Sequence, residues 1–269
     1  MKSGLAIAMD AFEDPALRAG PYNVLLICYA GEEGPHDGNE LADVLEEFEE
    51  LRDADLAIVL EPTDLAVQLG CLGGLHATLT FKGKPAHSAR PWQGENAITK
   101  AGAVLAALHE REPDDVEVEG LMFREVFTAT LADTPSATRN IVPDLFQVNL
   151  NYRYAPHRRL TNAEERIWEL VEGVGEVEIT DIAPPAKPFR NDRFVEAFIR
   201  TADAAVEPKQ AWTDVARFAE LNVAALNYGP GLTAQAHQDG EHVPIANVVA
   251  ARSALGRFLS GVGEENETS

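Results

Sequence analysis

The sequence has few cysteines and a shortage of basic side chains. Only Cys28 and Cys71 occur among its 269 residues, and each lies in an apolar stretch. We therefore expect two buried free thiols and no disulfide. The chain carries 22 lysines and arginines against 44 aspartates and glutamates, for a formal charge of -22. Nucleic-acid binding is disfavoured, because phosphate requires a basic surface.

Long apolar runs are absent as well. No stretch approaches the roughly 20 apolar residues that cross a bilayer as a helix. The short apolar N-terminal stretch lacks the longer centre and clear cleavage site of a signal peptide. We expect no membrane association and, by default, a cytoplasmic protein. Hydrophobic residues form 45% of the chain, enough for one large domain or two smaller ones.

Helices alternate with apolar strands at both ends of the chain. Residues 22–30 and 56–60 are continuous apolar runs, which are typical of strands buried on both faces. Residues 4–12 and 39–52 have the spacing of amphipathic helices. This alternation predicts an α/β fold with a mixed, mostly parallel sheet.

The pattern differs between residues 73 and 183. There, half-buried strands with one polar face alternate with helices in the order βαββαβ, the split arrangement of ferredoxin-like modules. The expected elements are strand 75–81, helix 95–110, strands 121–132 and 145–154, a helix from residue 161 and strand 177–182. We expect residues 73–183 to form a module inserted into an α/β domain of residues 1–72 and 184–269.

Acidic side chains follow both apolar runs. Glu32 and Glu33 come directly after the first run, and Glu61 follows the second. Ligands of open α/β sheets bind beyond the carboxyl ends of strands. Two adjacent carboxylates there repel each other, and a cation would relieve that repulsion. A solvated polar turn explains the same residues without any function, so both interpretations stay open.

Other polar residues have a less specific pattern. His237 lies six residues after the turn Gly229-Pro230-Gly231, within reach of a metal, although a lone histidine is more often a surface residue. His87 lies in a polar loop after the first strand of the inserted module. Arg153 could pair with a carboxylate or simply be an exposed strand residue, and both interpretations stay open.

Taken together, these segments resemble one family, the di-zinc aminoacylase/carboxypeptidase family of metallopeptidases and deacylases. The resemblance covers essentially the whole chain, in the order MKSG, GEEG, VLEPTD, GKPAHSARPWQGENAI, RNIVPD, NYRYAP, WTDVARF and NYGPG…AHQDGEHV. It implies two zinc ions per subunit, for which cobalt can substitute, and a homodimer formed through the inserted module, which serves as a dimerisation or lid domain.

The resemblance also implies a role for each matched residue. Glu32 would be the general base, and His87 would reach across the dimer to stabilise the oxyanion. Glu33 and His237 would bind one zinc, and Glu61 the other. The positions that correspond to substrate-binding residues are Asn140, Arg153 and Gly231. Such a site would use a zinc-bound water to hydrolyse the amide of a small N-acyl amino acid.

Several motifs are most similar to the actinobacterial group of succinyl-diaminopimelate desuccinylases, but acetylornithine deacetylases share almost all of them. In the family, a His-x-Asp motif and a bridging aspartate precede the segment matched by residues 1–4. We therefore expect the chain as given to bind zinc poorly, to have little activity and to expose a sheet edge. A non-catalytic homologue that binds a small acidic metabolite, or only dimerises, is the alternative.

Overall fold

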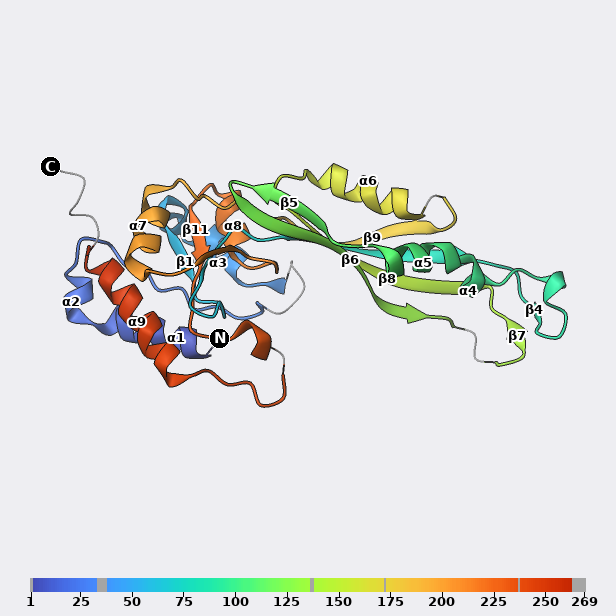
Figure 1. The fold of residues 1–269 in the computed structure, drawn as a ribbon, viewed down its shortest axis with the longest axis horizontal. Helices are drawn as coiled ribbons and strands as arrows, with labels where there is room; N and C mark the ends of the chain where they lie inside the picture. Colours follow the sequence, from blue (N-terminus) through green and yellow to red (C-terminus); the bar gives the residue numbers. More distant parts are fainter. Residues whose placement is uncertain (1, 33–37, 136–137, 172, 237, 263–269) are drawn as a thin grey trace. The chain divides into compact units, whose positions relative to one another are not determined.

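A computed structural model describes residues 2–32, 38–135, 138–171, 173–236 and 238–262, which divide into two compact units (Figure 1). The first unit consists of Met1–Cys71, Glu119–Leu121 and Ala186–Ser269, and the second of Leu72–Val118 and Met122–Pro185. In the part of the chain that the structure describes, no helix combines the length and the apolar character that a bilayer crossing requires.

The first unit contains a four-stranded mixed sheet. Its strands lie in the order β1-β11-β2-β10, with β1 parallel to β11 and β10 parallel to β2, while β11 and β2 are antiparallel. The strands are β1 (Ala57–Val59), β2 (Val67–Leu69), β10 (Val206–Pro208) and β11 (Ala225–Asn227). The mostly parallel sheet expected from the sequence is confirmed.

Helices pack around this sheet. They are α1 (Lys2–Glu13), α2 (Pro15–Arg18), α3 (Leu41–Glu47), α7 (Arg193–Ala202), α8 (Val215–Glu220) and α9 (Ile245–Leu259). Figure 1 shows α1 and α9 side by side, and Arg252 of α9 joins them by ion pairs with Asp10 and Asp14 at 2.5 and 3.0 Å. Pro244 precedes the first turn of α9, where its missing N–H costs nothing.

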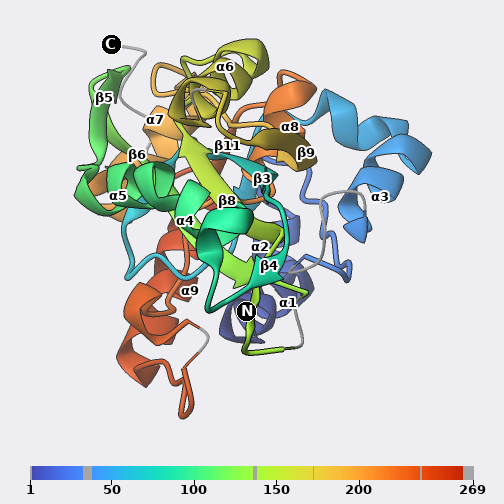
Figure 2. The same ribbon diagram turned by 90° about the vertical axis from the view of Figure 1, so that its right-hand side faces the viewer.

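The second unit is built on an antiparallel sheet. Strand order β5-β6-β8-β3-β9 contains the ferredoxin-like order of the four expected strands, with one extra strand at the edge. The strands are β3 (Gly73–Lys82), β5 (Asp114–Val118), β6 (Leu121–Asp133), β8 (Leu145–Tyr154) and β9 (Glu176–Ala183). A two-stranded ribbon of β4 (Ala86–His87) and β7 (Ile141–Val142) lies at one end of this unit, nearest the viewer in Figure 2.

One face of the second sheet is covered by helices α4 (Ala97–Lys100), α5 (Gly102–Glu110) and α6 (Leu160–Val171). The strand β3 alternates as expected. Its buried side chains Leu75, Ala77, Leu79 and Phe81 pack with α6 residues such as Ile167 in one core. Burial of these side chains supplies the main stabilisation of the unit, at about 25 cal/mol for each Å² of apolar surface.

Some local predictions were wrong. Residues 23–30 form no strand, and the run is half exposed, with Leu25 56% accessible. Cys28 is therefore exposed, whereas Cys71 is buried as expected. An apolar run requires sheet partners on both sides to be buried, and in the described part of the chain no strand pairs with these residues. The strand β5 was not predicted, because its sequence DDVEV is charged, as edge strands often are.

The helix expected over residues 39–52 is also interrupted. The helix α3 ends at Glu47, and Phe48 has φ −109° and ψ 88°, outside the helical region. The guanidinium of Arg52 donates hydrogen bonds to the carbonyl oxygens of Leu45 and Glu46, at 2.6 and 2.8 Å. These bonds satisfy carbonyl groups that a continuing helix would have used, so the arginine ends the helix.

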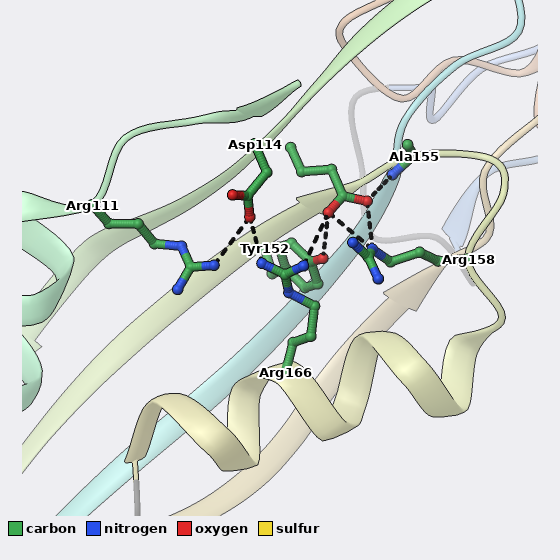
Figure 3. Close-up of polar contacts among 7 residues, drawn as sticks. Arg111, Asp114, Tyr152, Ala155, Arg158 and Arg166 are labelled. Atoms are coloured by element: carbon green, nitrogen blue, oxygen red, sulfur yellow. Dashed lines mark hydrogen bonds and ion pairs between the residues drawn. The ribbon is translucent and has the colours of Figure 1, made fainter. Parts of the chain in front are cut away.

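A polar network that the sequence did not reveal lies within the second unit (Figure 3). The Glu125 side chain is fully buried and accepts hydrogen bonds from Tyr152 Oη and the Ala155 N–H, both at 2.9 Å, and from Arg158 Nε at 2.7 Å. Arg166 lies 3.7 Å from the same carboxylate and also pairs with Asp114. A buried charge is tolerated when it is paired and hydrogen-bonded in this way.

Candidate functional site

Glu61 lies just beyond the end of β1, with 9% of its surface exposed. The parallel neighbour β11 ends at Asn227 and leads into the turn that contains Gly231. The Asp64 N–H donates to the Gly231 carbonyl at 2.8 Å, and the Gly229 N–H donates to Thr63 Oγ1 at 3.0 Å. The structure thus brings Gly231 beside the loop of Glu61, as parallel strands that end at one sheet edge do.

Close contacts explain why Gly229 and Gly231 are glycines. A Cβ atom at Gly229 would lie 2.3 Å from the carbonyl oxygen of Glu61, and one at Gly231 would lie 2.8 Å from Pro62 Cβ. No other side chain fits at those distances without moving the backbone. The glycines therefore allow the turn to approach the loop of Glu61 closely.

Glu32 lies in a half-buried turn after the extended segment. The carboxylates of Glu32 and Glu61 both interact electrostatically with the phenol of Tyr29. The pKa of Tyr29 is raised well above its ordinary value, first by burial, then by Asp214, and further by Glu32 and Glu61. Both carboxylates therefore lie within electrostatic range of one hydroxyl group, which groups two of the predicted residues at one place in the first unit.

Lys209 belongs to the same neighbourhood and was missed in the sequence. It follows β10, is 7% exposed, and donates from Nζ to the carbonyl of Pro62 at 3.2 Å. Burial lowers the pKa of Lys209, while Glu61 and Glu32 oppose that shift. In the sequence, the only feature that distinguishes Lys209 is its position directly after the end of a strand, and many surface lysines share that position.

The expected metal ligands are described only in part. Glu33 and His237 lie outside the described residues. Among the residues with described positions, no three His, Cys, Asp or Glu side chains come together to hold a metal. The buried carboxylate of Glu61 is a donor of the type that zinc accepts, and Glu32 adds negative charge nearby. The chemistry of the described donors thus fits a cation, while the complete ligand set stays a prediction.

His87 and Asn140 lie together in the second unit. His87 is on β4 opposite Ile141 of β7, and the Ser88 N–H donates to the Asn140 carbonyl at 2.9 Å. Both side chains are exposed. The Ala89 N–H donates to Nδ1 of His87 at 3.0 Å, so the neutral imidazole carries its proton on Nε2. Nε2 is therefore available as a hydrogen-bond donor.

Arg153 lies in the five-stranded sheet, at the end far from the β4–β7 ribbon. On β8 it pairs with Gly74 at the start of β3, while the β4–β7 ribbon lies beyond the other end of β3, past Lys82 (Figure 1). Those eight residues of strand span roughly 26 Å at about 3.3 Å per residue. A Cβ at Gly74 would lie 2.8 Å from Arg153 Nη1, so this glycine makes room for the guanidinium. Within one chain, the second unit does not bring Arg153 to His87 and Asn140.

Comparison with known proteins supplies a family for these features. Residues 70–177 match the model of a peptidase dimerisation domain. A Mycobacterium tuberculosis protein named succinyl-diaminopimelate desuccinylase DapE is 37% identical over 263 residues, 97% of this chain and 73% of that protein. The succinyl-diaminopimelate desuccinylase of Corynebacterium glutamicum is 33% identical over 97% of this chain and 72% of its own length.

More distant matches include one deacetylase sequence and two solved structures with a similar fold. An acetylornithine deacetylase of Myxococcus xanthus is 29% identical over 76% of this chain and 57% of its own length. A tripeptidase structure from Staphylococcus aureus matches with a TM-score of 0.75 at 18% identity, covering 98% of this chain and 71% of the other. An M20 family metallo-carboxypeptidase from Sulfolobus solfataricus matches with a TM-score of 0.62 at 18% identity, over 82% and 66% of the two chains.

Proposed function

Because the chain belongs to the M20 family of metallopeptidases and deacylases, whose members hydrolyse amide bonds, we propose that it is a succinyl-diaminopimelate desuccinylase. The reaction would be hydrolysis of N-succinyl-LL-2,6-diaminopimelate to succinate and LL-diaminopimelate. The observation that carries this proposal is the 37% identity to a protein of that name over 97% of the chain. Glu32 and Glu61, which both lie within electrostatic range of Tyr29, support the same chemistry.

In the proposed reaction, Glu32 acts as the general base. Its carboxylate takes a proton from the attacking water, whose oxygen bonds to the succinyl carbonyl carbon. As the carbon–nitrogen bond breaks, Glu32 passes this proton to the leaving amine. Glu33, Glu61 and His237 would hold the metal. Zinc, when bound, makes the water more acidic and polarises the carbonyl group.

The other matched residues would bind the substrate. The Nε2–H of His87 would donate to the carbonyl oxygen as negative charge develops there. Asn140 lies beside His87, so we propose that the two act together, in the site of a second copy of the chain. Arg153, at the far end of the five-stranded sheet, would hold a substrate carboxylate in the other copy of the site.

We propose that this second copy pairs along the free edge of β6. The hairpin partner β5 has only five residues, and the part of β6 from Thr128 to Asp133 is exposed, with Leu131 72% accessible. On that side, no strand pairs with residues 128–133 within the described chain. An open edge with apolar side chains favours pairing with another strand, and a two-fold axis would pair it with itself.

A substrate panel tests the proposed reaction. The protein produced from its complete gene would be loaded with zinc and offered N-succinyl-LL-diaminopimelate, N-acetylornithine and an N-acyl-lysine, with release of the amine measured. We expect cleavage of the first substrate, and loss of it in Glu32→Gln by about 1000-fold or more. Preferred cleavage of N-acetylornithine would favour a deacetylase like that of Myxococcus xanthus, and no cleavage of the first substrate would overturn the proposal.

A further inference from the structure

The turn that carries Glu32 begins and ends at a single buried carboxylate. Tyr29 precedes the turn, Asn39 follows it, and both donate hydrogen bonds to Asp214. Tyr29 Oη bonds to Oδ2 in a short contact, and Asn39 Nδ2 bonds to Oδ1 at 2.8 Å. Asp214 is 1% exposed and Asn39 is 3% exposed, so water does not compete for these bonds.

A second pair of bonds closes the same segment. The Ala30 N–H donates to Glu40 Oε2 at 2.9 Å, and the Glu40 N–H donates to the Ala30 carbonyl at 3.2 Å. Next to it, Gly31 has φ +78°, and a Cβ there would lie 2.6 Å from the carbonyl oxygen of Gly38. The two ends of the loop are therefore in close contact, and only glycine allows this approach.

Asp214 is itself held in place. It precedes α8, and Arg217 on the first turn of that helix lies 3.3 Å from Oδ1 through its Nε. The arginine compensates the buried negative charge, which would otherwise be costly. Burial and Asp214 also raise the pKa of Tyr29, so its hydroxyl keeps its proton at neutral pH and stays a donor. Tyr29 and Asn39 are therefore the donors in these hydrogen bonds, and the Asp214 carboxylate is the acceptor.

From this geometry we propose that Asp214 is a positioning residue for the general base: through Tyr29 and Asn39 it holds both ends of the Glu32 loop in place. This inference rests on the proposed function, because it takes Glu32 as the base. Asp214 belongs to the segment WTDVARF, which matches the family, but the resemblance implies no role for Asp214 itself. A bond lost at the ends of the loop lets the carboxylate of Glu32 move, and a displacement of about 1 Å can cost a hundredfold in rate.

Tyr29→Phe is the sharpest test, because it removes one hydroxyl group and leaves the ring. We expect kcat to fall by about 10- to 100-fold, with KM within about twofold. The matched control is Tyr22→Phe, in the same segment, whose ring stacks on Phe258 at 5.2 Å. Asn39→Asp is a second variant. It keeps the Oδ1 atom that accepts from the Leu41 N–H at 2.9 Å, but replaces the donor to Asp214 with a like charge.

Hydrogen–deuterium exchange of amides in the peptide of residues 28–42 gives a readout that needs no substrate. Faster exchange in this peptide of Tyr29→Phe, with exchange elsewhere and the melting temperature unchanged, would show that the bond to Asp214 holds the ends of the loop, even if no N-acyl substrate were cleaved. In that case only the proposed function would fail. Unchanged exchange and unchanged kcat in Tyr29→Phe, or an equal loss of kcat in Tyr22→Phe, would overturn the positioning role.

Discussion

The backbone N–H of Ala89 donates a hydrogen bond to Nδ1 of His87, at 3.0 Å. This bond orients an exposed imidazole ring and assigns its proton to Nε2. In the proposed reaction, a donor oriented before any substrate arrives would lower the reorganisation needed to stabilise an oxyanion.

We therefore predict that His87→Ala lowers kcat of the proposed reaction by about 100- to 1000-fold. The melting temperature should hardly change, because the side chain is exposed and makes no core contacts. His109→Ala, which removes another exposed imidazole of the same unit, is the control and should keep full activity. Equal rates for the wild type and His87→Ala would contradict this role.

The free edge of β6 predicts the oligomeric state. Leu131→Asp places a charge on the exposed strand and should convert a dimer to a monomer, as measured by light scattering after size-exclusion chromatography. Val174→Asp changes a 50% exposed apolar residue in the turn before β9 and should leave the dimer intact. A dimer that survives Leu131→Asp would show that another surface holds the two copies together.

The two cysteines should react very differently. Burial raises the pKa of the Cys71 thiol to about 11, so almost no thiolate forms at pH 8, whereas Cys28 is exposed. A thiol reagent such as dithionitrobenzoate should label one cysteine per native chain and two in denaturant. Cys28→Ser should abolish the labelling of the native chain, and labelling that persists in this variant would mean that Cys71 becomes accessible.

Removing the charge of Glu125 should destabilise the second unit. Glu125→Gln leaves Arg158 without its buried partner, and we expect the free energy of unfolding to fall by about 3 kcal/mol. Urea unfolding followed by circular dichroism measures this change. Glu117→Gln, on the exposed edge strand β5, should change stability by less than about 0.5 kcal/mol. Similar unfolding midpoints for the two variants would show that the network in Figure 3 adds little.

Asp114 makes the stability of this unit depend on pH. Partial burial acts to raise its pKa, but hydrogen bonds and ion pairs with Arg111 and Arg166 prevail and lower it below the ordinary value of 3.8. A lowered pKa in the folded state contributes stability above pH 3.8 that is lost as the pH falls through the lowered value. Wild type should therefore be more stable than Asp114→Asn at pH 6, and the difference should shrink below pH 3. A constant difference between pH 6 and 2.5 would contradict this linkage.

Elements that form their own amphipathic core could be predicted from the sequence. The alternation from Leu75 to Phe81 predicted β3 and its buried face, because a strand side chain must point to one face or the other. The four main strands and the helix α6 of the second unit were predicted in the same way. The edge strand β5 was not, since its stability comes from β6 and not from its own charged sequence.

The sequence by itself determined the residue types of a metal-dependent hydrolase and their order along the chain, because each motif is a local pattern. Only the tertiary structure decided which residues meet. It placed Gly229 against Glu61 and Gly231 against Pro62, added Lys209 beside them, and separated Arg153 from His87 by the length of the five-stranded sheet. It also joined Tyr29 and Asn39 through Asp214, more than 170 residues further along the chain. Contacts at such separations depend on how the strands pair and pack, which no local pattern in the sequence encodes.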